Sequence, residues 1–139
     1  MRLVFIGSGD IGLPSLEALL SASGHQVVAV VTQPDRPVGR SQQVTFSQIK
    51  QTALAAGVPV LQPEKIRDAV DDLRALQADL FIVIAYGQIL SRAVLDAPRL
   101  GCLNVHASLL PRHRGCGFGF SRLLPRHSPI TCCRNDRST

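Results

Sequence analysis

The stretch RLVFIGSGDIGLPSLEALL, residues 2–20, joins a short apolar run to an amphipathic segment through a turn rich in glycine. Residues 2–6 carry β-branched and aromatic side chains, which predict a buried strand. Leucines recur at helical spacing after the turn, so residues 13–22 are predicted as a helix, with Gly24 as the stop signal after it. The turn has the G-x-G-x-x-G spacing of dinucleotide-binding sheets, with glycines at Gly7, Gly9 and Gly12. This stretch therefore predicts the first strand–turn–helix unit of an α/β fold.

The same alternation of apolar runs and amphipathic segments continues along the chain. Further strands are predicted at 26–32, 58–62, 79–87 and 101–108, and further helices at 46–57, 63–77 and 91–97. Ser47 is a candidate N-cap of the first of these helices, and Gly57 is a stop signal at its end. Alternating strands and helices, joined by right-handed crossovers, predict a Rossmann-like, doubly wound parallel sheet. Ligands of such sheets bind beyond the carboxyl ends of the strands.

Composition limits the class of protein. The 139 residues suit one domain, and apolar residues, 45% of the chain, can fill one core; aromatic residues are only 4%, so that core must be aliphatic. No apolar run is long enough to cross a membrane, and the amino terminus lacks the pattern of a signal peptide. Together with four cysteines that need no disulfide framework, these features predict a cytoplasmic protein without a membrane partner.

The glycine turn has two interpretations. A dinucleotide site also needs an acidic residue at the tip of the second strand, but Asp35 lies beyond that tip, behind Pro34 and in a loop. The glycines can instead serve only a tight turn and close packing of the helix on the strand. The loop at residues 33–43 contains proline and glycine, and it carries Arg36 and Arg40. It is either a solvated surface loop or a basic finger for a phosphate-rich partner.

The most informative stretch is GCLNVHASLLPRHRG, residues 101–115, because it ends a strand with polar side chains. Asn104 and His106 project from the same face of that strand, roughly 7 Å apart. An amide can donate a hydrogen bond to a carbonyl oxygen that gains negative charge, and an imidazole can transfer a proton near neutral pH. Together they suit attack of a nucleophile on a polarised carbonyl carbon. The spacing of histidines and cysteines matches no common metal site, so no metal is expected.

Three segments carry a resemblance to a known family: NVHASLLPRHRG at 104–115, TQPDRPVGR at 32–40 and VIAYGQIL at 83–90. The first resembles the signature of the folate-dependent formyltransferases. The other two resemble the branch of that family that acts on methionyl-tRNA. The resemblance extends over residues 1–115, and it implies a Rossmann-like amino-terminal domain followed, in the family, by a smaller β-barrel domain. It also implies transfer of a formyl group from 10-formyltetrahydrofolate to the amine of methionine on initiator tRNA.

The resemblance assigns roles to individual residues. Asn104 would bind the formyl oxygen, and His106 would handle the proton. Arg36 and Arg40 would meet the acceptor arm of the tRNA. The tetrahydrofolate would lie against residues of two segments, namely Tyr86, Gly87, Leu90, Ser108, Leu109, Leu110 and Pro111.

The chain departs from the family pattern after Gly115. Residues 116–139 contain three of the four cysteines, and their four arginines and one acidic residue supply +3 of the net charge of +5. The family's next helix and its L-D-T-G-D segment, whose aspartate orients the histidine, find no match here. PITCCRND at 129–136 faintly resembles the family's threonine strand.

These departures lead to an expectation about domains and activity. We expect residues 1–115 to be a partial formyltransferase domain with an incomplete sheet, and residues 116–139 to be an aberrant, disordered tail. The β-barrel domain is expected to be absent, formyl transfer lost or low, tRNA binding weakened and the chain monomeric. Two other functions stay open at this point. One is an oxidoreductase that binds NAD or NADP at the glycine turn, and the other is an interaction fragment without enzymatic activity.

Overall fold

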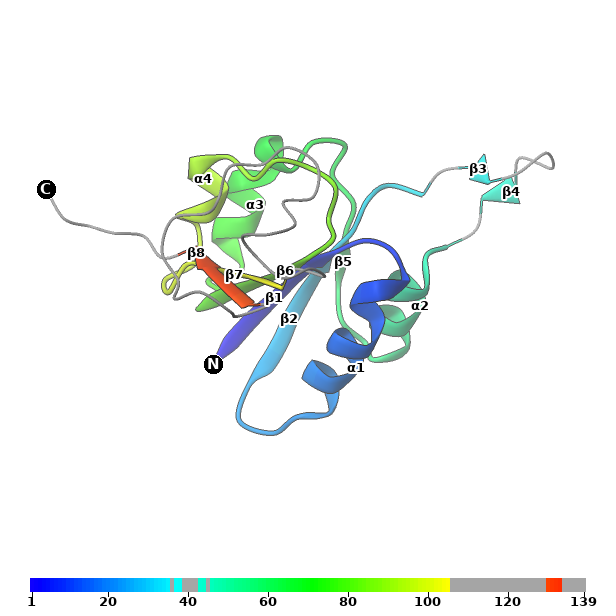
Figure 1. Ribbon diagram of the computed structural model, residues 1–139, viewed down its shortest axis with the longest axis horizontal. Helices are drawn as coiled ribbons and strands as arrows, with labels where there is room; N and C mark the ends of the chain where they lie inside the picture. The colour runs from blue at the N-terminus through cyan, green and yellow to red at the C-terminus, as the bar shows by residue number, and fades with distance from the viewer. Residues whose placement is uncertain (36, 39–42, 45, 106–129, 134–139) are drawn as a thin grey trace, which may run out of the picture.

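The computed structural model describes residues 1–35, 37–38, 43–44, 46–105 and 130–133. Its centre is a six-stranded sheet in the order β5-β2-β1-β6-β7-β8 (Figure 1). The first five of these strands run parallel, and β8 is antiparallel to β7. The strands of the sheet are β1 (Arg2–Gly7), β2 (Gln26–Val31), β5 (Val60–Leu61), β6 (Leu80–Ile84), β7 (Cys102–Val105) and β8 (Ile130–Cys133).

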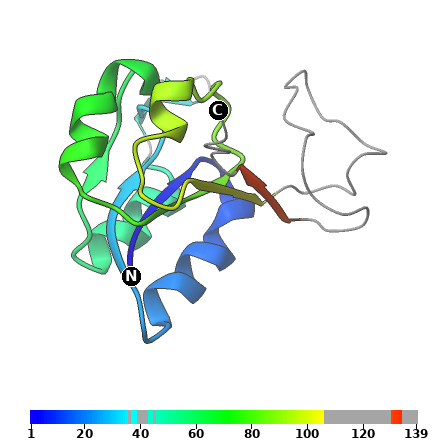
Figure 2. The same ribbon diagram turned by 90° about the vertical axis from the view of Figure 1, so that its left-hand side faces the viewer.

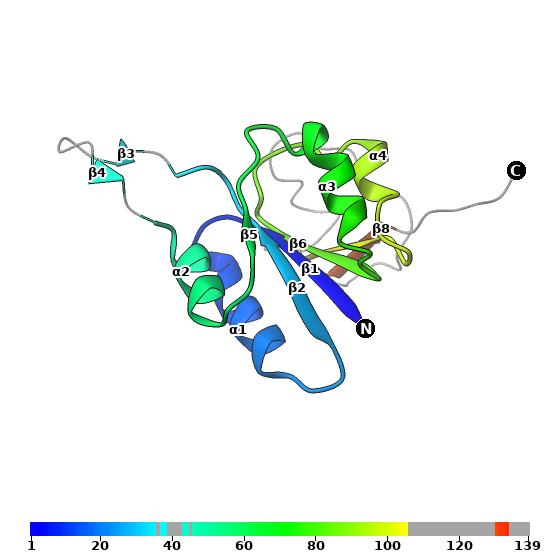
Figure 3. The ribbon, with the colours of Figure 1, turned by 180° about the vertical axis from the view of Figure 1, so that it is seen from behind.

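Helices cover both faces of the sheet, as Figures 2 and 3 show. One face carries η1 (Asp10–Gly12), α1 (Leu13–Ser21) and α2 (Gln48–Ala55). The other face carries η2 (Ile66–Ala69), α3 (Val70–Ala75) and α4 (Arg92–Leu95). A hairpin of β3 (Pro37–Val38) and β4 (Gln43–Val44) projects away from the sheet (Figure 1). None of the helices in the described ranges is both long and apolar enough to cross a bilayer.

The sheet has a separate apolar core on each face, because successive residues of a strand point to opposite sides. In β1, Val4 packs on the α3/α4 side and Phe5 on the α1/α2 side. The pairing of β2 with β1 slips by one residue between Leu3 and Val4. As a result, the consecutive residues Val28 and Ala29 both pack on the α3/α4 side.

The predicted doubly wound α/β fold is confirmed, and so are its main elements. The five predicted strands up to residue 105 and the four predicted helices all occur, with ends shifted by a few residues. Ser47 caps α2, because its side chain accepts a hydrogen bond from the Lys50 N–H at 3.2 Å. The helix predicted from residue 63 begins only at Ile66, with a 3₁₀ turn, because side-chain bonds from Gln88 hold the preceding backbone in a loop.

Strand β8 occupies part of the segment for which we expect disorder. Its backbone pairs with β7, with Cys102 opposite Cys133 and Val105 opposite Ile130. This pairing corrects the expectation at these four residues. The outer edge of β7 would otherwise expose unpaired backbone groups, and backbone pairing with β8 satisfies them.

The rest of the expected tail is not tested by the structure. Residues 116–129 and 134–139 lie outside the described residues. The expected domain division at residue 115 therefore stays a prediction.

Replacing Leu16 by alanine tests the packing of α1 on the sheet. Leu16 is fully buried (0% exposed), whereas Leu54 on α2 is 51% exposed and serves as a matched control. Leu16→Ala should lower the free energy of unfolding by about 2–5 kcal/mol, because it leaves a cavity in the core. Leu54→Ala should lower it by less than about 0.5 kcal/mol. Urea denaturation followed by circular dichroism measures both, and equal losses would contradict this packing.

Candidate functional site

Four loops meet at the carboxyl edge of the sheet, and Gln33 joins them. The main-chain N–H of Gln33, after β2, donates to Ser8 Oγ in the loop after β1, at 3.2 Å. Its side-chain amide donates to the carbonyl oxygen of Tyr86, after β6, at 2.9 Å. Its carbonyl oxygen accepts a hydrogen bond from Gln62 Nε2, after β5, at 3.0 Å. One residue therefore ties together the ends of β1, β2, β5 and β6.

Gln88 adds further bonds at the same edge. Its Nε2 donates to Gln33 Oε1 at 3.1 Å and to the carbonyl oxygen of Glu64 at 2.9 Å. Its Oε1 accepts the Ile66 N–H at 2.9 Å, so the side-chain amide uses both of its ends. Such connected amides favour a single backbone arrangement, because a partly broken network leaves polar groups unpaired. We call Gln33, Gln62 and Gln88 the glutamine network.

No sequence motif singles out this network. Glutamine carries no motif of its own, and the three residues are far apart along the chain. The one available signal is that each lies at the end of a predicted strand or directly after it. That position is where ligands of an α/β sheet bind.

The backbone after β6 adopts an unusual conformation. Ala85 has a φ of 46° and Gly87 a φ of 83°, both in the left-handed region. An alanine pays roughly 1–2 kcal/mol for this conformation, so tertiary contacts must hold it. The Gln33 bond to the Tyr86 carbonyl lies between these two residues and is one such contact. Gly87 and Leu90 are two residues of the expected folate site on this loop. Gly87 is exposed, and Leu90 is partly buried against the α3/α4 core.

Tyr86 contributes its backbone to this edge and its ring to the core. The residue is only 3% exposed and packs in the α3/α4 core. Its hydroxyl has no hydrogen-bond partner among the residues that the structure describes. Burial raises the pKa of this hydroxyl to about 12, so it stays protonated at neutral pH. The expected place of Tyr86 in a folate site stays a prediction.

Asn104 lies on β7, opposite Val83 of β6, and its side chain is partly exposed. Val83 packs in the α3/α4 core, and directly paired residues project to the same face of a sheet. Asn104 therefore faces the α3/α4 side, close to the carboxyl end of its strand. An amide at this position can donate a hydrogen bond to an oxygen that gains negative charge.

The remaining predicted site residues lie outside the described part of the chain. His106, the expected partner of Asn104, is one of them. The others are Ser108, Leu109, Leu110 and Pro111 of the expected folate site, and Arg36 and Arg40 of the expected tRNA contact. Within the described ranges, no group of three or more potential metal ligands occurs.

Close packing accounts for the glycine turn. A Cβ atom at Gly7 would lie 2.8 Å from the carbonyl oxygen of Ile84 and 2.7 Å from the Phe5 ring. A Cβ atom at Gly12 would lie 3.2 Å from the same ring. These glycines therefore let β1 approach β6 and let η1 approach the sheet. This geometry favours the interpretation of a tight turn that needs no bound ligand.

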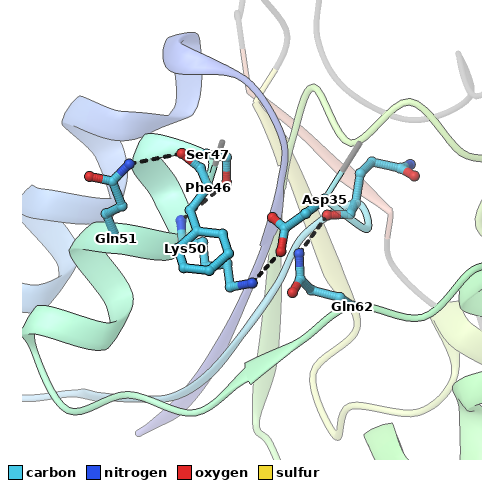
Figure 4. Close-up of polar contacts among 7 residues, drawn as sticks. Asp35, Phe46, Ser47, Lys50, Gln51 and Gln62 are labelled. Carbon is cyan, nitrogen blue, oxygen red and sulfur yellow. Dashed lines mark hydrogen bonds and ion pairs between the residues drawn. The ribbon is translucent and has the colours of Figure 1, made fainter. Parts of the chain in front are cut away.

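Asp35 forms an ion pair with Lys50 at the base of the β3–β4 hairpin (Figure 4). The two side chains are only 16% and 14% exposed. The hydrogen bond from Lys50 holds the pKa of Asp35 below its usual value of 3.8, and Gln62 acts in the same direction against the effect of burial. Because its carboxylate is bound to Lys50, Asp35 is poorly suited to bind a ribose as the acid of a dinucleotide site does.

Comparison with known sequences finds similarity over most of the chain. A family model described as Formyl transferase matches residues 1–118. A methionyl-tRNA formyltransferase from Moorella thermoacetica is 56% identical over 117 residues, which cover 83% of this chain and 37% of that protein. Another, from Acidobacterium capsulatum, is 56% identical over 118 residues, with 83% and 38% covered. The chain thus spans little more than a third of the length of these curated relatives.

Comparison with solved structures finds the same fold. A phosphoribosylglycinamide formyltransferase from Anaplasma phagocytophilum has a TM-score of 0.64 at 19% identity, covering 84% of this chain and 54% of that chain. A glycinamide ribonucleotide transformylase 1 from Geobacillus kaustophilus has a TM-score of 0.63 at 24% identity, with 83% and 62% covered. At these identities the likeness shows a shared fold.

A comparison of Gly7→Ala with Gly9→Ala tests the packing at the turn. At Gly9 nothing lies within 4 Å of an added Cβ, and the cost comes from its φ of 80°, about 1–2 kcal/mol. At Gly7 the added Cβ meets a backbone oxygen, so β1 and β6 must separate, and we expect a loss of about 3 kcal/mol or more. Urea denaturation measures both free energies of unfolding. A stable Gly7→Ala variant would refute the close approach of β1 to β6.

The lowered pKa of Asp35 makes the ion pair sensitive to acid. Its stabilisation is fully present above the pKa of Asp35 in the unfolded chain and is lost as pH falls through the lower pKa of the folded chain. The difference in free energy of unfolding between the original chain and Asp35→Asn should therefore shrink below pH 3.8. Denaturation at a series of pH values checks this. Asp71→Asn, which removes an exposed ion pair with Arg74, should have little effect at any pH.

Proposed function

This chain belongs to the formyl transferase family, and we propose that it is the formyl-donor part of a methionyl-tRNA formyltransferase. Family membership confirms the resemblance inferred from the three sequence segments. The observation that carries the proposal is sequence identity. This chain is 56% identical to two curated methionyl-tRNA formyltransferases over the matched residues. It is only 19% and 24% identical to the two solved structures with the same fold. The proposed reaction moves the formyl group of 10-formyltetrahydrofolate to the amine of methionine on initiator tRNA, in the cytoplasm.

The first chemical requirement of the proposed reaction is to stabilise negative charge on the formyl oxygen, and in the proposal Asn104 meets it. The amine nitrogen attacks the formyl carbon, a new C–N bond forms, and the carbonyl oxygen gains negative charge. The Asn104 side-chain amide donates a hydrogen bond to that oxygen and so stabilises the tetrahedral intermediate. The bond between the carbon and N10 of the folate then breaks, and the carbonyl group forms again.

His106 meets the second requirement, which is proton transfer. The attacking amine must lose a proton, and N10 of the folate must gain one as it leaves. An imidazole accepts and returns a proton near neutral pH, and His106 follows Asn104 by two residues. The step balances, because one C–N bond replaces another and one proton moves from the amine to N10.

The proposed donor site lies beside the loop after β6. The glutamine network reaches this loop at the Tyr86 carbonyl and at Gln88, on either side of Gly87. It thereby holds the loop, which presents the exposed backbone of Gly87 and the apolar side chain of Leu90. A backbone held in this way can position a donor without rearrangement when it binds. In the proposal, the ring of Tyr86 supports this loop from the core. Ser108, Leu109, Leu110 and Pro111 complete the site.

The proposed tRNA contact lies in the hairpin between β2 and α2. Arg36 and Arg40 belong to this segment, and arginines bind the phosphates of nucleic acids. The hairpin projects from the sheet (Figure 1), as contact with a partner as large as tRNA requires. We further propose that residues 1–115 are a partial formyltransferase domain whose formyl transfer is low or lost, that residues 116–139 take no part in the chemistry, and that the chain is monomeric.

Asn104→Ala tests the proposed chemistry. Loss of one donor to a developing oxyanion lowers the rate of formyl transfer by about 10²–10³-fold. Donor affinity should change far less, because the charge on the oxygen develops only during the reaction. Transfer is measured with 10-formyltetrahydrofolate and methionyl initiator tRNA. Affinity is measured by calorimetry with 5-formyltetrahydrofolate, whose formyl group is not on N10.

Gln26→Ala is the matched control, because it removes an exposed amide at the opposite end of the sheet. Its rate of transfer and its donor affinity should equal those of the original chain. A chain that binds no folate would contradict the proposal, as would an Asn104→Ala variant that transfers formyl at the original rate. Binding of NAD or NADP in place of folate would favour the oxidoreductase alternative.

A further inference from the structure

We infer that Gln33 is a positioning residue, whose side-chain amide holds the loop after β6 in the backbone conformation that receives the formyl donor. The identity of this donor rests on the proposed function. The amide donates to the Tyr86 carbonyl at 2.9 Å and accepts a hydrogen bond from Gln88 Nε2 at 3.1 Å. It also lies beside Gly87, where an added Cβ atom would be 3.9 Å from Gln33 Nε2. One side chain therefore runs along three successive residues of this loop.

Gln33 can hold the loop because its own backbone is fixed. Its N–H donates to Ser8 Oγ at 3.2 Å, and its carbonyl oxygen accepts a hydrogen bond from Gln62 Nε2 at 3.0 Å. The ring of Pro34 restricts the backbone of the residue before it to extended conformations. With both polar groups of its main chain bound, Gln33 presents its amide from a defined position just beyond β2.

The loop needs such a contact because its backbone is strained. Ala85 has a φ of 46°, and an alanine on its own disfavours this left-handed conformation about five- to thirtyfold. One hydrogen bond acts in the opposite direction by about two- to tenfold. The two effects are of comparable size, so loss of the Gln33 bond shifts a large part of the population to a relaxed backbone.

The other anchors of this loop do not set the direction of the Tyr86 carbonyl. Ile84 pairs with β1 in the sheet, and the ring of Tyr86 packs in the α3/α4 core. Rotation of the carbonyl also turns the N–H of Gly87, because both groups belong to one planar peptide unit. The exposed backbone of Gly87 is part of the proposed donor site. Gln33 therefore sets the direction of a polar group in that site without touching the reacting atoms.

Affinity for the donor follows from the fraction of molecules that carry the loop in the held conformation. The apparent affinity of a ligand falls in proportion to this competent fraction. Removing the amide donor of Gln33 should therefore weaken the affinity for 5-formyltetrahydrofolate about two- to tenfold. Calorimetry measures this affinity and needs no formyl transfer.

Two variants remove the bond to the Tyr86 carbonyl in different ways. Gln33→Glu keeps the shape of the side chain and an acceptor for Gln88, but its carboxylate cannot donate at neutral pH. Gln33→Met removes both polar ends without adding a charge. In each, the ¹³C signals of Ala85, which report its backbone conformation in NMR, should move away from left-handed values. Circular dichroism checks that each variant is folded at the temperature of the measurement.

Gln51→Met is the matched control for both variants. Gln51 Nε2 also donates to a main-chain carbonyl oxygen, that of Phe46, at 2.8 Å, but it does so beside α2 and away from the loop after β6. Its loss should leave the Ala85 signals and the affinity for 5-formyltetrahydrofolate unchanged.

Ala85→Gly separates the positioning role from a general loss of stability. Glycine adopts a positive φ without the cost that alanine carries, so the loop then depends less on the Gln33 bond. Adding Ala85→Gly to Gln33→Met should return the affinity for 5-formyltetrahydrofolate to within about twofold of the original value. A variant weakened only by loss of overall stability has no reason to recover in this way.

Unchanged Ala85 signals in both Gln33 variants would overturn the positioning role. The same conclusion follows from altered signals with unchanged folate affinity, or from a Gln33→Met variant that Ala85→Gly fails to restore. An original chain that binds no folate would contradict the proposed function. In that case the Ala85 signals still decide whether Gln33 holds the loop.

Discussion

The parallel pairing of β1 with both β2 and β6 is the constraint on which the rest of the structure depends. β1 runs in register beside Leu80–Ile84 of β6 and, with one slip, beside β2. The three strands end together, so their loops arrive at one edge. Gln33 can then bond both to Ser8 and to the Tyr86 carbonyl. A side chain at Gly7 would separate β1 from β6 and loosen this edge.

Locally unfavourable features gather at this same edge. Ala85 has a left-handed backbone, Tyr86 buries a hydroxyl for which the described residues offer no partner, and Lys50 lies in the first turn of α2. Core packing holds the Tyr86 ring, the Gln33 bond to the Tyr86 carbonyl helps to hold the backbone at Ala85, and the ion pair with Asp35 holds Lys50. Such costs cluster where a protein binds or acts, since elsewhere a less costly residue serves equally well. Their concentration supports the carboxyl edge as the working surface of this chain.

Much of the fold could be predicted from the sequence, because apolar residues recur along the chain at the spacings typical of buried strands and helices. Apolar runs and helical leucine spacing predicted the strands and helices, and Ser47 was correctly predicted as a cap. Strand β8 was not predicted, because its pairing depends on a distant edge of β7. Asn104 was correctly placed near the end of a strand, but the glutamine network was missed, because its bonds join residues without a common motif. The role of Tyr86 in a folate site was expected from the resemblance, whereas its burial could only be seen in the structure.

By itself, the sequence determined the α/β class and the order of its elements, and it predicted the edge at which ligands would bind. These follow from periodic burial, which is a property of neighbouring residues. The tertiary structure alone decided which side chains meet at that edge. It paired Asp35 with Lys50 instead of leaving the acid for a ribose, and it brought Gln33 to Gln88 across 55 positions of the chain. Such contacts depend on distance in space, for which a linear pattern carries no signal.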